Sequence, residues 1–542
     1  MAATLSRSGT GVYNQPGRRL LAAVARTLSD GDTTPSSSPL RVILAGHNGD
    51  LDALRSGQGE FTPETLSAAY ARISRSPEPV PELRRLAREE VERARSSNRT
   101  IVFGLGHHSV AEHAVLSFDI LGCSRLAIEA LEWHRLCSFT EKSQRYITLD
   151  GDYVVPAELS AHEVEGLQTL IAEQNRTYQR LLPRLEERQL ALHPEMAERA
   201  VARRVLEGRA KEDARYAVAL ATQGQLGFTC NARNLELIVR RMRQSHLEEV
   251  RRLGDLLFAQ ARAVVPSLLI LADEEAFREA YGAALCDAYF DHGPADLARA
   301  ASEVEVAPLA APGPGTRRGR CTLVDHTPDP DAAVIASLLF CAERGPLAAC
   351  REAARAMSSD QRRRLVCGAL THLSEHDAPP RAFEEAVFRF EIVLDASAMA
   401  QLKRHRMATQ HWGPYDPDLG TTLPPEVEAI GDGPSFAALM ERTAETYLVL
   451  RRSLGARGGP VEAAAYALTN AHRRRVAVTA NLREVYHFSR LREDGHAQWD
   501  IRGIAADLSA LVREKAPITS MLLGGKDRYA EIYRQAMGGG GE

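Results

Sequence analysis

Two stretches of the chain alternate apolar and polar residues in nearly the same order. Ala114–Ile120 reads Ala-Val-Leu-Ser-Phe-Asp-Ile, and Ala386–Ile392 reads Ala-Val-Phe-Arg-Phe-Glu-Ile. Alternation with a period of two predicts a strand that has one buried face. Short apolar runs at Arg41–Gly46 and Cys321–Asp325 predict a further strand ahead of each stretch. The strand pattern therefore occurs twice along the chain.

Helical patterns lie between the predicted strands. One extends from Pro63 to about Ser97, and Thr62 followed by Pro63 is typical of a helix start. Another begins near Leu235 and is broken at Pro266. Each half of the chain is thus expected to mix sheet and helix.

Short motifs also repeat at fixed offsets. Trp133-His-Arg stands 271 residues before Arg404-His-Arg, and Asn231-Ala-Arg stands 250 residues before Asn481-Leu-Arg. Matched segments in the same order indicate a tandem duplication. We expect a disordered leader over residues 1–40, a first domain over 41–290, a linker over 291–320 and a second domain over 321–542.

Composition limits the classes of function. The 542 residues are 44% hydrophobic and 25% charged, which is ordinary for a globular chain. A net charge of −4 gives no electrostatic reason to expect nucleic acid or an anionic membrane as a partner. Eight cysteines without a Cys-x-x-Cys motif favour reduced thiols in a cytoplasmic protein. No cluster of residues predicts a metal site.

One segment carries the most specific signal. Gly106-His-His-Ser109 is followed by Trp133-His-Arg-Leu-Cys-Ser-Phe-Thr-Glu-Lys-Ser-Gln-Arg-Tyr146, and the second half adds Arg404-His-Arg406 and a block from Arg490 to Arg502. This pattern resembles the flavin-dependent thymidylate synthase family, whose signature is R-H-R-x-x-S-x-N-E-x-S-x-R-Y. The resemblance covers most of both halves.

The resemblance implies a fold and a reaction. The fold is α+β: two tandem copies of an antiparallel sheet flanked by helices, which form a pseudo-dimer, so that a homodimer of chains rebuilds the family's tetramer. The reaction methylates dUMP to dTMP, with methylenetetrahydrofolate as carbon donor, FAD as cofactor and NADPH as reductant. The expected partners are therefore small nucleotide and folate molecules.

The resemblance also assigns roles to residues. The ring-activating, catalytic residue is Arg492, and His107 is on the folate side. The expected dUMP-binding residues are Gln401, Arg404, Ser143, Arg145 and Arg215. The expected FAD-binding residues are Ser109, Glu141, Arg404, His405, Arg406, Asn481, Arg483, His487, Asn231 and Arg233.

Neither copy is complete, and the losses are complementary. In the first copy, the family's Gln, leading Arg and activating Arg fall on Ala130, Trp133 and Met242. The second copy lacks the Ser-x-Arg-Tyr end, and Ala465 stands where the first copy has Arg215. We therefore expect one composite active site, with Gln401, Arg404 and Arg492 from the second half and the phosphate-binding residues from the first.

Two other functions remain open: a decayed homologue that still binds flavin or nucleotide, and an enzyme that methylates another pyrimidine nucleotide. Some residues also have a simple structural interpretation. Arg125 is expected in a structural ion pair, His113 as a structural histidine, and Arg473–Arg475 on a solvated face.

Overall fold

The computed structural model describes residues 39–57, 61–290, 300–301, 303–304 and 320–538. Apart from Pro39 and Leu40, the predicted leader lies outside the described residues, as does most of the predicted linker at 291–320. The predicted domain boundaries at these segments stay predictions.

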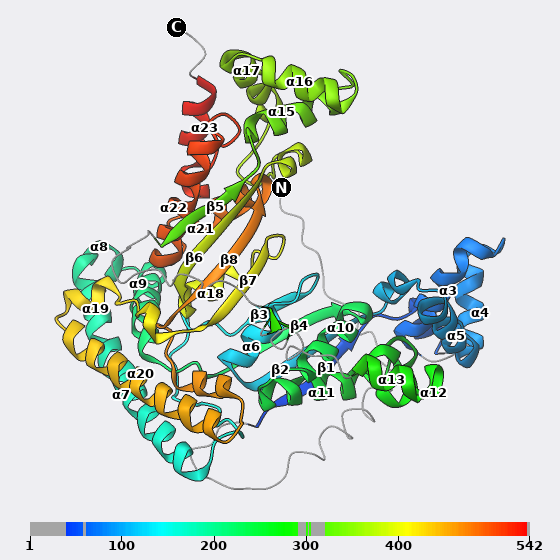
Figure 1. Cartoon of the computed structure of the whole chain (residues 1–542), viewed down its shortest axis with the longest axis horizontal. Coiled ribbons are helices and arrows are strands. Elements are labelled where there is room, and N and C mark those ends of the chain that lie inside the picture. Colours follow the sequence, from blue (N-terminus) through cyan, green and yellow to red (C-terminus); the bar gives the residue numbers. More distant parts are fainter. Residues whose placement is uncertain (1–38, 58–60, 291–299, 302, 305–319, 539–542) are drawn as a thin grey trace, which may run out of the picture. The chain divides into compact units, whose positions relative to one another are not determined.

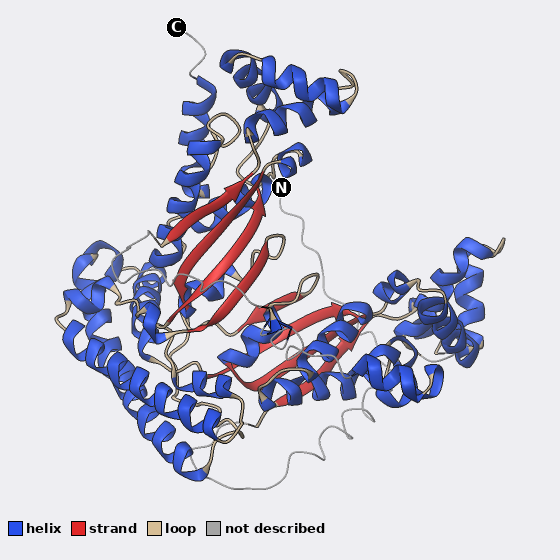
Figure 2. Ribbon diagram, viewed as in Figure 1, coloured by secondary structure: helices blue, strands red, loops and turns tan. Residues whose placement is uncertain are grey.

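The described strands form two four-stranded antiparallel sheets, both coloured red in Figure 2. The first has the order β1-β2-β4-β3, with β1 (Arg41–His47), β2 (Val115–Ser124), β3 (Ser138–Glu141) and β4 (Gln223–Asn231). The second has the order β5-β6-β8-β7, with β5 (Cys321–His326), β6 (Val387–Asp395), β7 (Thr409–Tyr415) and β8 (Arg473–Asn481). The central registers also agree, because Val115 lies opposite Asn231 and Val387 opposite Asn481. The duplication and the α+β fold are confirmed.

Helices surround each sheet (Figure 1). The first half contains α2 (Leu51–Ser56), α3 (Pro63–Arg72), α4 (Val80–Glu89), α5 (Val91–Asn98), α6 (Arg125–Glu132), α7 (Ala161–Leu192), α8 (Pro194–Ala197), α9 (Ala200–Ala214), α10 (Ala232–Arg243), α11 (Glu248–Arg262), α12 (Glu274–Tyr281) and α13 (Ala283–Phe290). The second contains α15 (Pro330–Cys341), α16 (Leu347–Ala356), α17 (Ser359–Leu370), α18 (Ala396–Leu402), α19 (Pro425–Ala429), α20 (Gly433–Ala456), α21 (Leu482–Arg492), α22 (Trp499–Lys515) and α23 (Tyr529–Gly538).

The helical pattern predicted over 63–97 is divided into the three helices α3, α4 and α5. Thr62 caps the first of them, since its side chain accepts a hydrogen bond from Glu64 N. The break between α3 and α4 contains Pro77 and Pro79, which restrict the preceding residues to extended backbone. The two prolines therefore interrupt the helix there, although the helical pattern of the sequence continues.

Each sheet buries one face under two equivalent helices. In the first half, Leu235 of α10 and Leu253 of α11 pack into one core with Phe118 and Phe228 of the strands. In the second half, Val485 of α21 and Ile504 of α22 pack into one core with Phe388 and Phe390 of β6. The same sequence pattern thus produces the same packing twice.

The two halves share a core and a pair of backbone hydrogen bonds. Leu167 and Leu170 of α7 pack with Leu450 and Leu454 of α20 in a single cluster. Between the halves, Leu220 N donates to Leu468 O at 2.7 Å and Asn470 N donates to Val218 O at 3.0 Å.

These two bonds are related by symmetry. Val218 and Leu220 each stand 250 residues before their counterparts Leu468 and Asn470, so each half donates one equivalent bond and accepts the other. Such reciprocity defines an isologous, two-fold contact. The halves therefore form a pseudo-dimer around a local two-fold axis.

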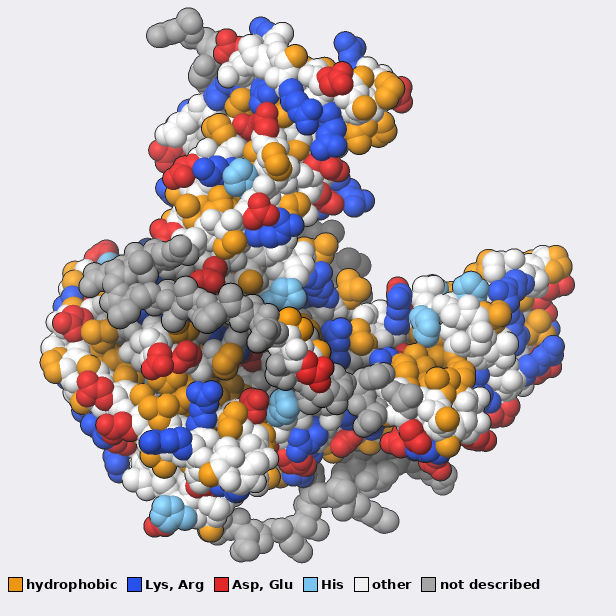
Figure 3. Space-filling model, viewed as in Figure 1, with side chains coloured by type: hydrophobic (Ala, Val, Ile, Leu, Met, Phe, Trp, Pro, Cys, Tyr) orange, Lys and Arg blue, Asp and Glu red, His pale blue; other side chains and the backbone are white. Residues whose placement is uncertain are grey.

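Charge is mixed on the surface. Figure 3 shows Lys and Arg side chains interspersed with Asp and Glu over the face in view. Among the residues that the structure describes, none of the helices combines the length and apolarity needed to cross a bilayer.

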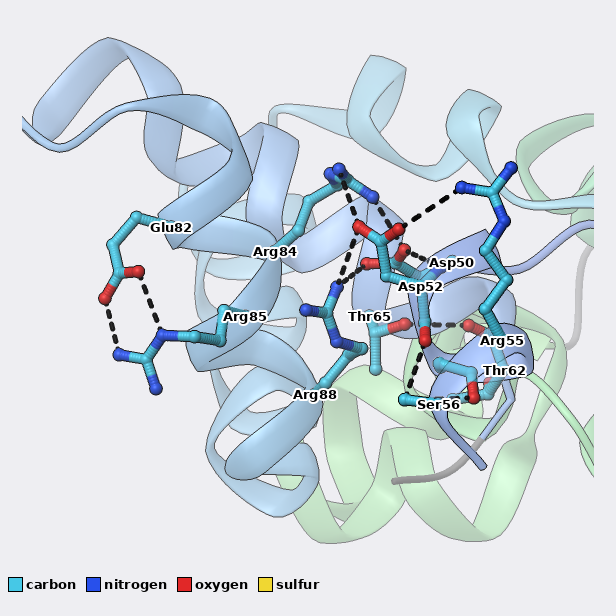
Figure 4. Close-up of polar contacts among 11 residues, drawn as sticks. Asp50, Asp52, Arg55, Ser56, Thr62, Thr65, Glu82, Arg84, Arg85 and Arg88 are labelled. Carbon is cyan, nitrogen blue, oxygen red and sulfur yellow. Dashed lines mark hydrogen bonds and ion pairs between the residues drawn. The ribbon is translucent and has the colours of Figure 1, made fainter. Parts of the chain in front are cut away.

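Asp50 joins α2 to α4 (Figure 4). Its carboxylate accepts from Asp52 N at 2.9 Å, which caps α2, and pairs with Arg84 Nη1 at 2.6 Å and with Arg88. The Asp50 side chain is buried, whereas Glu82 and Arg85 pair on the exposed side of α4.

Asp50→Ala should lower the free energy of unfolding by about 2 kcal/mol or more, because it removes a helix cap and leaves two guanidinium groups without their buried partner. Urea unfolding measures the change. Glu82→Ala removes an exposed partner on the same helix and should leave the unfolding curve nearly unchanged. Equal effects of the two substitutions would contradict this account of the Asp50 cluster.

Candidate functional site

Residues from both halves line one opening of about 650 Å³. Arg145 comes from the first half, just after β3, while Gln401 belongs to α18 and Arg492 is the last residue of α21. The sequence predicted these three side chains for one nucleotide site. Residues 145 and 492 are far apart in the chain, and the pseudo-dimer is what brings them onto the same opening.

The contacts of Arg492 fix its direction. Its Nε donates to His405 Nε2 at 2.9 Å, and its Nη1 donates to Gln401 Oε1 at 3.4 Å. His405 Nδ1 lies 3.3 Å from Glu484 Oε1. Gln401 is buried, and its Nε2 has no hydrogen-bond partner among the described residues. The opening is therefore bordered by an oriented guanidinium and by a glutamine whose buried Nε2 has no partner in the described structure.

The cluster is electrostatically suited to an anion. Burial, together with repulsion from Arg404 and Arg145, lowers the pKa of Arg492 to about 10. Burial and the nearby Arg492 also lower the pKa of His405 well below its usual value, so that this imidazole is neutral. A bound dianion would relieve the mutual repulsion of the guanidinium groups.

The other predicted phosphate residues lie behind Arg145. Ser143 Oγ accepts from Arg145 N at 3.2 Å, and Arg145 Nε lies 2.5 Å from Glu212 Oε1. Arg215 is buried, donates through Nε to Glu212 O at 3.3 Å, and has an unpartnered Nη2 in the described structure. Ser143 and Arg215 do not themselves line the 650 Å³ opening.

A second opening, of about 480 Å³, also combines the halves. Of the predicted flavin residues it is lined by Asn231 from the first half and by Arg404, Arg406 and His487 from the second. Arg404 Nη2 lies 3.4 Å from Glu141 Oε2, and Glu141 also pairs with Arg125 at 2.8 Å. Arg404 is half-exposed and borders this opening. Its charge also repels that of Arg492, which borders the 650 Å³ opening.

These residues fit a flavin nucleotide. Two guanidinium groups, an amide and an imidazole on one opening are the donors that a diphosphate and the polar edges of an isoalloxazine ring require. The volume is within the range of small-molecule sites. Arg406 and Asn231 also make contacts that stabilise the structure itself.

Arg406 donates to Cys137 O of the first half, and its counterpart Arg135 donates to Ala408 O of the second half at 2.8 Å. Asn231 caps α10 and Asn481 caps α21, each accepting from the backbone three residues on. Both kinds of contact occur in each half. Their first role is therefore structural: the arginines stabilise the interface between the halves, and the asparagines cap helices.

Other predicted residues lie away from the two openings. His107 and Ser109 are exposed, and neither lines either opening. Arg233 pairs with Glu112, and Arg483 donates to Pro379 O at 2.9 Å. Their flavin or folate roles stay predictions.

The symmetry-related side of the pseudo-dimer has been remodelled. Trp133 and Trp412 stand where the other side has Arg404 and Glu141, so an aromatic pair with ring centroids 6.2 Å apart replaces an ion pair. Met242, the counterpart of Arg492, is buried in the core. This side has an opening of about 400 Å³ that is the counterpart of the 480 Å³ opening, with Trp133 in place of Arg404 and Leu237 in place of His487.

The expectation for Arg473–Arg475 was wrong in part. These residues open β8, and Arg474 is buried, where it pairs with Glu129 and lies 4.1 Å from the Tyr415 ring centroid. The sequence alone does not show that a carboxylate of the other half, Glu129, pairs with Arg474 and allows it to be buried. The sequence reading also missed the buried ion pair of Glu132 with Lys403, although the 271-residue offset makes these two positions equivalent.

The sheets and the composite openings define a duplicated α+β protein with an arginine-lined opening between its halves. The family model described as "Thymidylate synthase complementing protein" matches residues 60–267 and 322–518, which together are more than half of the chain. The chain belongs to this family, as a tandem duplication of it.

Several relatives are named flavin-dependent thymidylate synthase. That of Clostridium tetani (strain Massachusetts / E88) is 29% identical over 216 residues, covering 39% of this chain and 82% of the relative. That of Geobacter sulfurreducens (strain ATCC 51573 / DSM 12127 / PCA) is 32% identical over 207 residues, covering 36% and 84%. That of Mycobacterium sp. (strain KMS) is 34% identical over 185 residues, covering 33% and 70%.

Among solved structures, the UMP/dUMP methylase PolB from Streptomyces cacaoi covers 45% of this chain and 96% of its own at a TM-score of 0.33 and 19% identity. A likeness at this level carries no conclusion about function.

Asp213, next to Glu212, gives a pH-dependent prediction. Burial raises the pKa of Asp213 to about 7, although Trp499 Nε1 donates to its carboxyl at 2.7 Å. The unfolded chain loses this proton near pH 4, whereas the folded chain keeps it to about pH 7, so the group's contribution to stability falls across that window.

Asp213→Asn removes this loss. Its stability relative to the unsubstituted protein should rise from about pH 4 to pH 7, by up to about 4 kcal/mol, and be level above pH 7. Denaturant unfolding across this pH range measures the difference. Asp150→Asn, at an exposed carboxylate, is the control. A constant difference at all pH values would refute the buried, protonated state of Asp213.

Proposed function

We propose that this chain is a flavin-dependent thymidylate synthase that converts dUMP to dTMP at one composite site per chain. Methylenetetrahydrofolate is the proposed carbon donor and NADPH the proposed reductant. The observation that carries the proposal is the shared opening on which Arg145 of the first half faces Gln401 and Arg492 of the second. Two chains would associate as a homodimer equivalent to the family's tetramer.

The first half would bind the phosphate. A nucleotide monophosphate is a dianion, and guanidinium groups and hydroxyls are its natural donors. Arg145 borders the opening, Ser143 is hydrogen-bonded to the backbone of Arg145, and Arg215 keeps an unpartnered Nη2 behind it. Burial, and after it the nearby cations Arg404 and Arg145, lower the pKa of Arg492, which supports an anion as the missing partner.

The second half would activate the uracil ring. Methylation forms a carbon–carbon bond at C5 with an electron pair from the ring, and the C5 proton leaves only afterwards, so the ring must first be polarised with partial negative charge at C5. Arg492 would stabilise that charge, because its guanidinium is buried and already oriented by His405 and Gln401. The free Nε2 of Gln401 is a donor for a carbonyl of the uracil.

When bound, a flavin supplies the hydride that reduces the transferred methylene to a methyl group. This chain's residues would hold it at the 480 Å³ opening, with Arg404 and Arg406 toward its phosphates. Glu141 orients Arg404, since it accepts ion pairs from both Arg404 and Arg125.

The pattern of replacement argues against the first alternative, a decayed homologue. A decayed homologue would lose residues on both sides, whereas here the symmetry-related side carries Trp133, Trp412 and Met242 and the other keeps Arg145, Gln401 and Arg492 on one opening. An enzyme for another pyrimidine nucleotide keeps the same phosphate and ring contacts, so only a substrate comparison decides against it. Release of tritium from C5-labelled dUMP, with dependence on NADPH and the folate, tests directly whether dUMP is the substrate.

Arg492→Ala should lower the rate of C5 tritium release by about 100-fold or more, because it removes the charge beside the ring in the transition state. Arg241→Ala is the matched control, since Arg241 is an exposed arginine on the equivalent helix α10 and borders only the remodelled side. An active Arg492→Ala protein would rule out Arg492 as the activating residue.

Arg145→Ala should weaken dUMP binding by about ten- to 100-fold, since a charge-assisted hydrogen bond to phosphate is lost. Binding of deoxyuridine, which has no phosphate, should change little. Calorimetric titration with both molecules separates a phosphate contact from a general loss of the site, which would weaken both to the same extent.

A further inference from the structure

Glu132 and Lys403 form a buried ion pair between the two halves. Glu132 Oε2 lies 2.7 Å from Lys403 Nζ, and their side chains are 3% and 0% exposed. Neither charged group has a hydrogen-bond partner elsewhere in the described chain. At this contact, the ion-pair partner of each charge therefore comes from the other half.

The two residues occupy equivalent positions. Lys403 stands 271 residues after Glu132, the same offset that relates the Trp133 and Arg404 triplets. Glu132 ends α6, and Lys403 follows α18, the equivalent helix. Equivalent residues that touch each other lie on the two-fold axis of an isologous contact.

This position discriminates between pairings. If two first halves paired through the same contact, Glu132 would face a second Glu132, and two second halves would bring Lys403 against Lys403. Either arrangement buries like charges without a partner, which is strongly unfavourable. Only a first half with a second half places opposite charges on the axis.

We propose that Glu132 and Lys403 are pairing-specificity residues, which restrict this interface to one first half and one second half. The consequence for activity rests on the proposed function, because only this pairing combines Arg145 with Gln401 and Arg492. Identical pairs would carry either two sets of phosphate residues or two sets of ring residues.

Neighbouring charges follow the same division. Glu129 of the first half pairs with Arg474 of the second, and Glu141 of the first pairs with Arg404 of the second. In each of these pairs the first half supplies the carboxylate and the second the cation, while buried Arg125 of the first half pairs with Glu141 of its own half. Lys403 is one of only five lysines among the 542 residues, so its place here is not a reflection of a lysine-rich surface.

A buried ion pair is weak as a source of stability but effective as a source of specificity. Its replacement by apolar residues should therefore leave thermal stability unchanged or higher while removing the discrimination. The test uses the full chain with Glu132→Leu and Lys403→Met together, refolded from denaturant over a range of protein concentrations.

Sedimentation velocity should show a single main species for the unsubstituted chain. The neutral double variant should show a shift to higher masses that grows with protein concentration. The reason is that the first halves of two chains, or their second halves, can now pair with each other. A double variant that refolds to the unsubstituted mass distribution at every concentration would overturn the proposal, whether its unfolding temperature falls or not.

Charge reversal supplies the matched test. Glu132→Lys alone and Lys403→Glu alone should each lower the unfolding temperature or the soluble yield, and the two together should restore both. A double reversal no better than the single ones would overturn a direct contact. Glu173→Leu with Arg442→Met, an exposed ion pair between the halves, is the control and should leave the mass distribution unchanged. No readout requires turnover, so failure here is distinct from failure of the proposed thymidylate synthesis.

Discussion

The contact between the two halves is the constraint on which the rest of the molecule depends. Two reciprocal backbone hydrogen bonds, between Leu220 and Leu468 and between Asn470 and Val218, fix the halves about a local two-fold axis. Helices α7 and α20 bury their apolar faces against each other beside those bonds. Arg145 and Arg492 belong to different halves, so the candidate nucleotide site exists only because this contact does.

Duplication within one chain also frees the two copies to diverge. A homodimer must keep every site residue in a single sequence, whereas here each copy can lose what the other retains. The remodelled side shows how completely this has happened: the Trp133–Trp412 pair replaces Arg404–Glu141, and buried Met242 replaces the charge of Arg492. Both sheets nevertheless keep the same strand order.

Local patterns predicted much of this structure. The alternating runs became β2 and β6, the apolar runs became β1 and β5, and the repeat offsets revealed the duplication. The sequence reading failed where distant partners decide the outcome. Arg474 is buried because Glu129 of the other half neutralises it. The helical pattern over 63–97 is divided for a local reason, since Pro77 and Pro79 separate α3 from α4. The family resemblance was needed to assign Arg145, Gln401 and Arg492 to one site, because hydrophobic periodicity does not predict which surfaces of the two halves come into contact.

The central claim is that two incomplete copies retain one complete site. The stoichiometry of dUMP binding tests it most directly, by calorimetric titration of the flavin-reconstituted chain at protein concentrations well above the dissociation constant. The account predicts one dUMP per chain, because the remodelled side lacks the predicted nucleotide-binding residues. Two molecules per chain would show that the remodelled side still binds nucleotide, and no binding would show that the composite site does not exist.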